Sequence, residues 1–80
     1  MSRDQIFEQL TTVFRDVFDD EDVTIHEKTT AADIEDWDSL THIMLLSAVE
    51  DEFDIKFDMK AVQGLKNVGE MVSLIAGLLK

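Results

Sequence analysis

Residues 37–53 read WDSLTHIMLLSAVEDEF, and this stretch decides the fold. One set of its apolar residues recurs at steps of three or four: Leu40, Ile43, Leu46, Val49 and Phe53. That spacing is typical of one face of an α-helix. Asp38 stands where the N-cap belongs, and its carboxylate also suits the positive end of a helix dipole. The stretch predicts a helix over residues 39–53 with those five residues facing inward.

Amphipathic helices are also predicted at both ends of the chain. Over residues 3–18 the inward positions are Ile6, Leu10, Val13, Phe14 and Val17. Over residues 67–79, with Asn67 as N-cap, they are Val68, Met71, Val72, Ile75 and Leu78. A short helix is predicted over residues 58–62, because Gly64 follows as a stop signal.

Residues 19–38 show no sustained period and are expected to form a long loop, with Ile25 and Ile34 as apolar anchors and one helical turn at 30–33. A loop of this length is uncommon in a compact domain unless it has a function. A chain of 80 residues suits one domain. The expected fold is all-α: a single domain over residues 1–80, with three long helices, one short helix and a long first loop.

The charge balance bears on the partners. The chain has 18 carboxylates against 7 Lys and Arg, which gives a formal charge of −11. Nucleic acid and anionic membranes are poor partners for such a surface, whereas proteins with basic docking patches suit it. No apolar run approaches the roughly 18 residues of a membrane span, and no signal peptide opens the chain. A cytoplasmic monomer that does not insert into membranes is expected.

The sequence gives little support for a catalytic site or a metal site. The absence of cysteine excludes a disulfide framework, a thiolate metal site and a cysteine nucleophile. Ser39 and His42 lie one helical turn apart, so a serine–histidine pair is conceivable, but so small a bundle has little room for an oxyanion hole and a cleft. No stretch fits the calcium loop with glycine at its sixth position. We expect no catalytic residue and no metal site.

The sequence resembles the acyl carrier protein family over essentially its whole length. An Asp-Ser pair alone is a common helix cap, but Asp38-Ser39-Leu40 matches the family's attachment motif, and residues 46–55, LSAVEDEFDI, resemble the end of its second helix. The apolar positions from Phe57 through Val68 also fit. The resemblance implies an acyl-carrier-like four-helix bundle.

The resemblance also implies that Ser39 receives 4′-phosphopantetheine from coenzyme A, through a separate transferase that uses magnesium. The arm ends in a thiol, which supplies the sulfur chemistry that the chain lacks. A phosphodiester on Ser39 would face the unsatisfied N–H groups at the start of the helix. The serine needs no activating base in its own domain.

Further site residues follow from the same resemblance. Residues expected to dock partners are Asp38, Leu40, Met44, Glu50, Asp51 and Glu52. Residues expected to line an acyl pocket are Leu46, Val49, Phe57, Val62, Leu65, Val68 and Val72, each of which also suits an ordinary core. The bulk of Phe53 and Phe57 predicts a smaller pocket than in fatty acid carriers.

The pathway and the cargo stay open. Trp37 before the motif, and Met44 where fatty acid carriers usually have an acidic residue, favour a dedicated pathway over housekeeping fatty acid synthesis. The implied partners are a phosphopantetheinyl transferase, an acyl-loading enzyme, and downstream synthases or transferases of lipid, polyketide or related biosynthesis. One alternative is an aminoacyl or peptidyl carrier loaded by an adenylating enzyme. Another is an acidic helical adaptor that leaves Ser39 unmodified.

Overall fold

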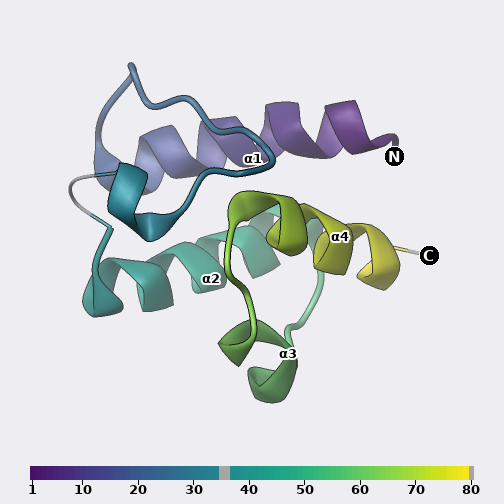
Figure 1. Ribbon diagram of the computed structural model, residues 1–80. Helices are drawn as coiled ribbons and strands as arrows, with labels where there is room; N and C mark the ends of the chain where they lie inside the picture. The colour runs from purple at the N-terminus through teal and green to yellow at the C-terminus, as the bar shows by residue number, and fades with distance from the viewer. Residues whose placement is uncertain (35–36, 80) are drawn as a thin grey trace.

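A computed structural model describes residues 1–34 and 37–79 as a bundle of α-helices (Figure 1). In chain order the elements are α1 (Arg3–Phe18), the 3₁₀ turn η1 (Ala31–Asp33), α2 (Ser39–Phe53), α3 (Met59–Gln63) and α4 (Val68–Leu78). The described residues contain no β-strand. The all-α architecture, with three long helices and one short one, is confirmed. The loop expected over residues 19–38 includes residues 35 and 36, which lie outside the described residues.

Helix α1 begins at a capping box. The Ser2 hydroxyl accepts a hydrogen bond from the Gln5 N–H (3.2 Å), and the Ser2 N–H donates to the Gln5 side-chain oxygen (2.8 Å). Such reciprocal bonds satisfy two donors that a helix start would otherwise leave unpaired. The buried residues of α1 are Ile6, Leu10, Val13, Phe14 and Phe18. Val17 was expected to face inward but is only half-buried, and Phe18 takes the core position.

Helix α2 buries only part of the face predicted for it: Val49 and Phe53 are buried as predicted, and Leu46 is half-buried. Its buried residues are Leu45, Val49 and Phe53, whereas the side chains of Leu40 and Ile43 are 69% and 66% exposed. The prediction that these two residues face inward is wrong. The cause is the apolar run at residues 43–46, which occupies every side of the helix, so spacing alone cannot select the face that packs.

The other helices complete the core. Helix α1 packs against both α2 and α4, and α3 lies on the far side from α1 (Figure 1). The Asn67 side chain caps the start of α4, and the helix buries Val68, Met71, Val72 and Ile75 as predicted. The prediction for Leu78 is wrong: its side chain is 41% exposed, near the last turn of α4.

The first loop is fastened to the start of α4. Val23 and Ile25 are buried in the core, and Ile34 is half-buried against it. The N–H groups of Val68 and Gly69 donate to the carbonyl oxygens of Thr29 (2.8 Å) and Glu27 (2.9 Å). The loop therefore supplies acceptors for two of the donors that open α4.

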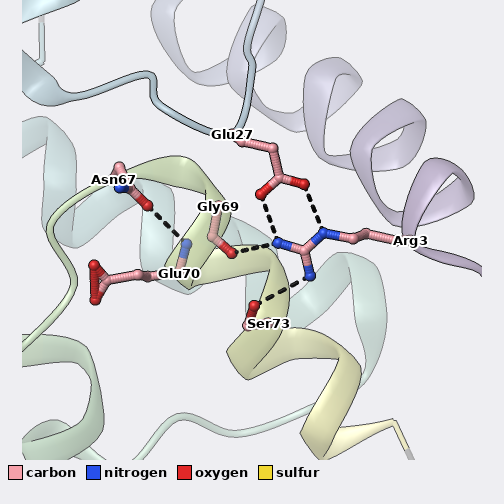
Figure 2. A network of polar contacts seen from close by, with 6 residues as sticks. All are labelled: Arg3, Glu27, Asn67, Gly69, Glu70 and Ser73. Atoms are coloured by element: carbon pink, nitrogen blue, oxygen red, sulfur yellow. Dashed lines mark hydrogen bonds and ion pairs between the residues drawn. The ribbon is translucent and has the colours of Figure 1, made fainter.

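Arg3 ties three segments together (Figure 2). Its guanidinium donates from Nε and Nη2 to the two carboxylate oxygens of Glu27, each at 2.6 Å. It also donates to the Gly69 carbonyl oxygen (2.9 Å) and the Ser73 hydroxyl (3.1 Å). A single side chain thus connects the start of α1, the first loop and α4.

This network predicts an acid-dependent stability. The hydrogen bond from Arg3 holds the pKa of Glu27 below its ordinary value of 4.5. A carboxyl with a lowered folded-state pKa contributes stability above that ordinary value, and the contribution is lost as the pH falls through the folded-state value. We expect wild type to be more stable than Arg3→Gln at neutral pH, and the difference to shrink in acid below pH 4.5.

Unfolding of both proteins across the acid range measures this difference. Arg15→Gln is the matched control, because Arg15 bonds a carbonyl oxygen, that of Val23 (2.9 Å), and has no carboxylate partner among the described residues. A difference between wild type and Arg3→Gln that stays constant down to strong acid would contradict the role of Glu27.

Candidate functional site

Ser39 is the first residue of α2 and is exposed to solvent. Asp38 caps the helix in front of it, where its Oδ1 accepts hydrogen bonds from the N–H groups of Leu40 (3.0 Å) and Thr41 (2.9 Å). The Asp38 N–H donates in return to the Thr41 hydroxyl (2.8 Å). These contacts fix the backbone on both sides of Ser39. Within the described residues, no group forms a hydrogen bond with the Ser39 hydroxyl, which is left accessible.

The capping contacts change the electrostatics of the helix start. The Thr41 N–H, assisted by the Thr41 hydroxyl and the Leu40 N–H, holds the pKa of the Asp38 carboxyl below its ordinary value. Asp38 is therefore an anion at neutral pH. The expectation that a phosphate on Ser39 would face unsatisfied N–H groups is wrong for Leu40 and Thr41, because Asp38 already occupies both donors.

A cavity of about 370 Å³ opens beside Ser39. The residues that line it are Ala31, Trp37, Asp38, Ser39, His42, Leu65, Lys66, Asn67 and Met71. They come from η1, the start of α2, the segment between α3 and α4, and α4 itself. Its volume lies in the usual range for small-molecule sites. The wall combines apolar side chains with an ammonium, an amide and an imidazole.

Trp37 joins this cavity to the end of α1. Its ring meets Phe14 edge to face at 5.2 Å between centroids, and Phe18 at 6.2 Å. The Trp37 ring also lies beside His42, with 5.9 Å between centroids and 26° between planes, and its indole N–H donates to His42 Nδ1 (3.1 Å). Aromatic pairs in such geometries contribute beyond their buried area. Trp37 is therefore a fixed wall of the cavity.

The same contact speaks against a serine–histidine catalytic pair. His42 Nδ1 accepts a hydrogen bond from the Trp37 indole N–H, so in the neutral imidazole the ring proton is on Nε2. A base for Ser39 would need a nitrogen free to accept within hydrogen-bond reach. Neither ring nitrogen meets that condition among the described contacts, and Ser39 forms no hydrogen bond with His42.

The expected docking residues differ in exposure and in their contacts within the bundle. Leu40, Met44 and Asp51 are exposed and lie near one face of α2, since steps of four and seven residues return to the same side. Glu50 is half-buried and accepts the Phe57 N–H (2.8 Å). Glu52, also exposed, accepts from Gln9 Nε2 (3.0 Å). Two of the three acidic residues thus have contacts within the bundle.

The expected pocket residues lie mainly in the core. Val49, Val68 and Val72 are 0% exposed, and Val62 is also buried. Leu46, Phe57 and Leu65 are half-buried against the core. Of the seven, Leu65 alone lines the cavity beside Ser39, and the others stay a prediction for an acyl chain that enters between the helices.

Several cavity residues were not assigned to a site from the sequence. Gly64 and the N-cap Asn67 can be recognised in the sequence. No local sequence pattern, however, predicts that Lys66 and Asn67 lie close to Ser39. Their approach depends on how the segment between α3 and α4 returns to the start of α2. Within the described residues, no helix is long and apolar enough to span a membrane, and no three histidine or acidic side chains are grouped to hold a metal ion.

Comparison with known proteins identifies the class. Residues 8–75 match the family described as "Phosphopantetheine attachment site". The mitochondrial acyl carrier protein of Saccharomyces cerevisiae is 35% identical over 81 residues, which cover 95% of this chain and 64% of that protein. The solution structure of the holo acyl carrier protein of Geobacter metallireducens has a TM-score of 0.86 and 41% identity, and the match covers 91% of this chain and 84% of that one.

This chain belongs to the phosphopantetheine-attachment family of carrier domains. It spans about two thirds of the length of the yeast relative, 64%. The prosthetic group of the family is phosphopantetheine, and the site has the chemistry to hold it. An exposed serine hydroxyl can form the phosphodiester, and Lys66 supplies a positive charge beside it in the same cavity.

Proposed function

We propose that this chain carries acyl groups as thioesters on a 4′-phosphopantetheine arm attached to the Ser39 hydroxyl. The observation that carries the proposal is the placement of that hydroxyl: exposed, without a hydrogen bond among the described residues, and fixed by the Asp38 cap. When attached, the group supplies a reactive thiol on a long flexible arm. The chain itself positions the arm and performs no catalysis.

The residues around Ser39 have separate roles in this proposal. Asp38 holds the backbone so that the hydroxyl projects from the helix start. The exposed Leu40 and Met44 offer an apolar surface to the enzymes that dock there, and Asp51 offers a negative charge two turns further on. Long-range attraction between the −11 charge and basic enzyme surfaces would speed the encounters.

The proposed partners follow from the chemistry of the arm. A phosphopantetheinyl transferase attaches it, a loading enzyme acylates its thiol, and synthases or transferases use the thioester. The name of the yeast relative places that protein in mitochondria, so a cytoplasmic location stays a prediction for this chain.

Intact mass after incubation with coenzyme A, magnesium and a broad-specificity transferase tests the proposal. We expect wild type to gain the mass of one phosphopantetheine and Ser39→Ala to gain none. Ser47→Ala is the matched control, because Ser47 is also an exposed serine of α2 and should leave the modification intact. An unmodified wild type, with the transferase active on another carrier, would favour the adaptor instead.

A further inference from the structure

We propose that the cavity beside Ser39 holds the attached end of the phosphopantetheine arm, with Lys66 binding its phosphodiester. This inference rests on the proposed function, because it requires the arm on Ser39. Ser39 lines the cavity itself, so the groups that directly follow its oxygen are the ones beside this wall. The thiol and its cargo lie at the other end of a long chain and can reach partner enzymes.

The phosphodiester needs a positive partner at this position. It brings a negative charge next to the Asp38 carboxylate, whose lowered pKa keeps it ionised. The helix start offers less compensation than usual, because Asp38 already holds the N–H groups of Leu40 and Thr41. Phosphate oxygens form their strongest hydrogen bonds with charged donors. The site therefore favours a cation close to Ser39.

Lys66 is the cation in the cavity wall. Its side chain is exposed and forms no ion pair within the part of the chain that the structure describes. An ammonium on a flexible stem is a common phosphate ligand in proteins. Lys66 can thus turn to the phosphodiester without giving up another contact.

The rest of the wall suits the groups that follow the phosphate in pantetheine. These groups are two methyls, a hydroxyl and two amides. Trp37, Leu65 and Met71 offer apolar surface for the methyls. Asn67 accepts the Glu70 N–H through Oδ1 (2.9 Å; Figure 2), which leaves its amide nitrogen as a donor. His42 likewise keeps an Nε2 proton to donate, since its Nδ1 is bonded to Trp37. The cavity thus pairs apolar surface with donors for oxygen acceptors.

NMR spectra of the apo and holo forms test the proposal directly. Trp37 and Asn67 are the only residues of their types in the chain, so the indole N–H and the Asn67 side-chain amide can each be assigned and followed. We expect both signals, and the ³¹P signal of the arm, to report contact in the holo wild type. Charge-assisted hydrogen bonds are stronger than neutral ones, so Lys66→Gln should weaken the contact and reduce the holo-minus-apo shifts.

Lys28→Gln is the matched control. It removes the same charge from an exposed lysine that lines a different cavity, with Asp4 and Phe7, and it should keep the wild-type shifts. A fully modified wild type whose Trp37 and Asn67 signals do not move would overturn this inference and leave the carrier function standing. Equal losses in the two lysine variants would overturn the role of Lys66. A wild type that gains no phosphopantetheine mass would overturn both proposals.

Discussion

Replacing Leu45 with alanine is expected to lower the free energy of unfolding by about 2–5 kcal/mol. Leu45 is 0% exposed and belongs to the main core cluster. Truncation removes its buried methyl groups and leaves a cavity that the surrounding helices can only partly fill. Because the whole stability of a small domain is roughly 5–15 kcal/mol, the loss is a large share. Denaturant unfolding followed by far-ultraviolet circular dichroism measures it.

Leu40→Ala is the matched control, because it makes the same chemical change on the same helix. The side chain of Leu40 is 69% exposed, and exposed substitutions usually change stability by less than about 0.5 kcal/mol. Equal losses at the two positions would mean that α2 presents a different face to the core from the one described. Since Leu40→Ala should remain folded, it also allows the proposed docking surface to be tested apart from stability.

Leu45 is buried and Leu40 is exposed, and the spacing of apolar residues in the sequence did not predict this difference. Helix ends are set by local chemistry, and the caps at Asp38 and Asn67 were predictable because side-chain oxygens there satisfy orphan N–H groups. The burial of Val49 and Phe53 was predictable too, but the side of the first half of α2 that packs was not, because Ile43 to Leu46 are all apolar. Helix α2 packs against α1, and this tertiary contact favours the side of the helix that carries Leu45.

Some residues of the candidate site could likewise be predicted from the sequence, and others could not. Ser39 and Asp38 are neighbours in the sequence, so the attachment residue and its cap could be predicted from a short motif. Lys66 and Asn67 are distant in the sequence, and only the return of the chain after α3 brings them to the cavity. The Trp37–His42 hydrogen bond depends on side-chain orientation, although the two residues are only five positions apart in the sequence.

Gly69 illustrates a constraint that the sequence shows only as a glycine inside a helical pattern. Such a residue usually weakens a helix relative to alanine, by about 1 kcal/mol. In the structure the first loop lies against this position. A Cβ built on Gly69 would stand 2.6 Å from the Glu27 carbonyl oxygen and 2.5 Å from Glu27 Oε1. The glycine allows the loop to approach α4 closely enough for their hydrogen bonds to form.

Gly69→Ala is therefore expected to destabilise the protein despite the better helix propensity of alanine. The Glu27 carboxylate could move only by giving up its bonds to Arg3, and the carbonyl oxygen belongs to the backbone that bonds the Gly69 N–H (2.9 Å). Forcing an extra carbon into a packed contact costs about 1–3 kcal/mol, which exceeds the propensity gain of at most about 1 kcal/mol. The melting temperature should fall, by about 4–8 °C for each kcal/mol lost.

Gly77→Ala gives the opposite expectation in the same helix. A Cβ at Gly77 would meet no atom within 4 Å, so only the propensity gain applies and stability should rise by about 0.4–1 kcal/mol. If Gly69→Ala lowers the stability and Gly77→Ala raises it, the loss at Gly69 comes from the contact between the first loop and α4. If Gly69→Ala stabilised the protein as Gly77→Ala does, the loop could not lie against α4 at the distances described. The conclusion that residues 27–29 are anchored to the start of α4 would then be wrong.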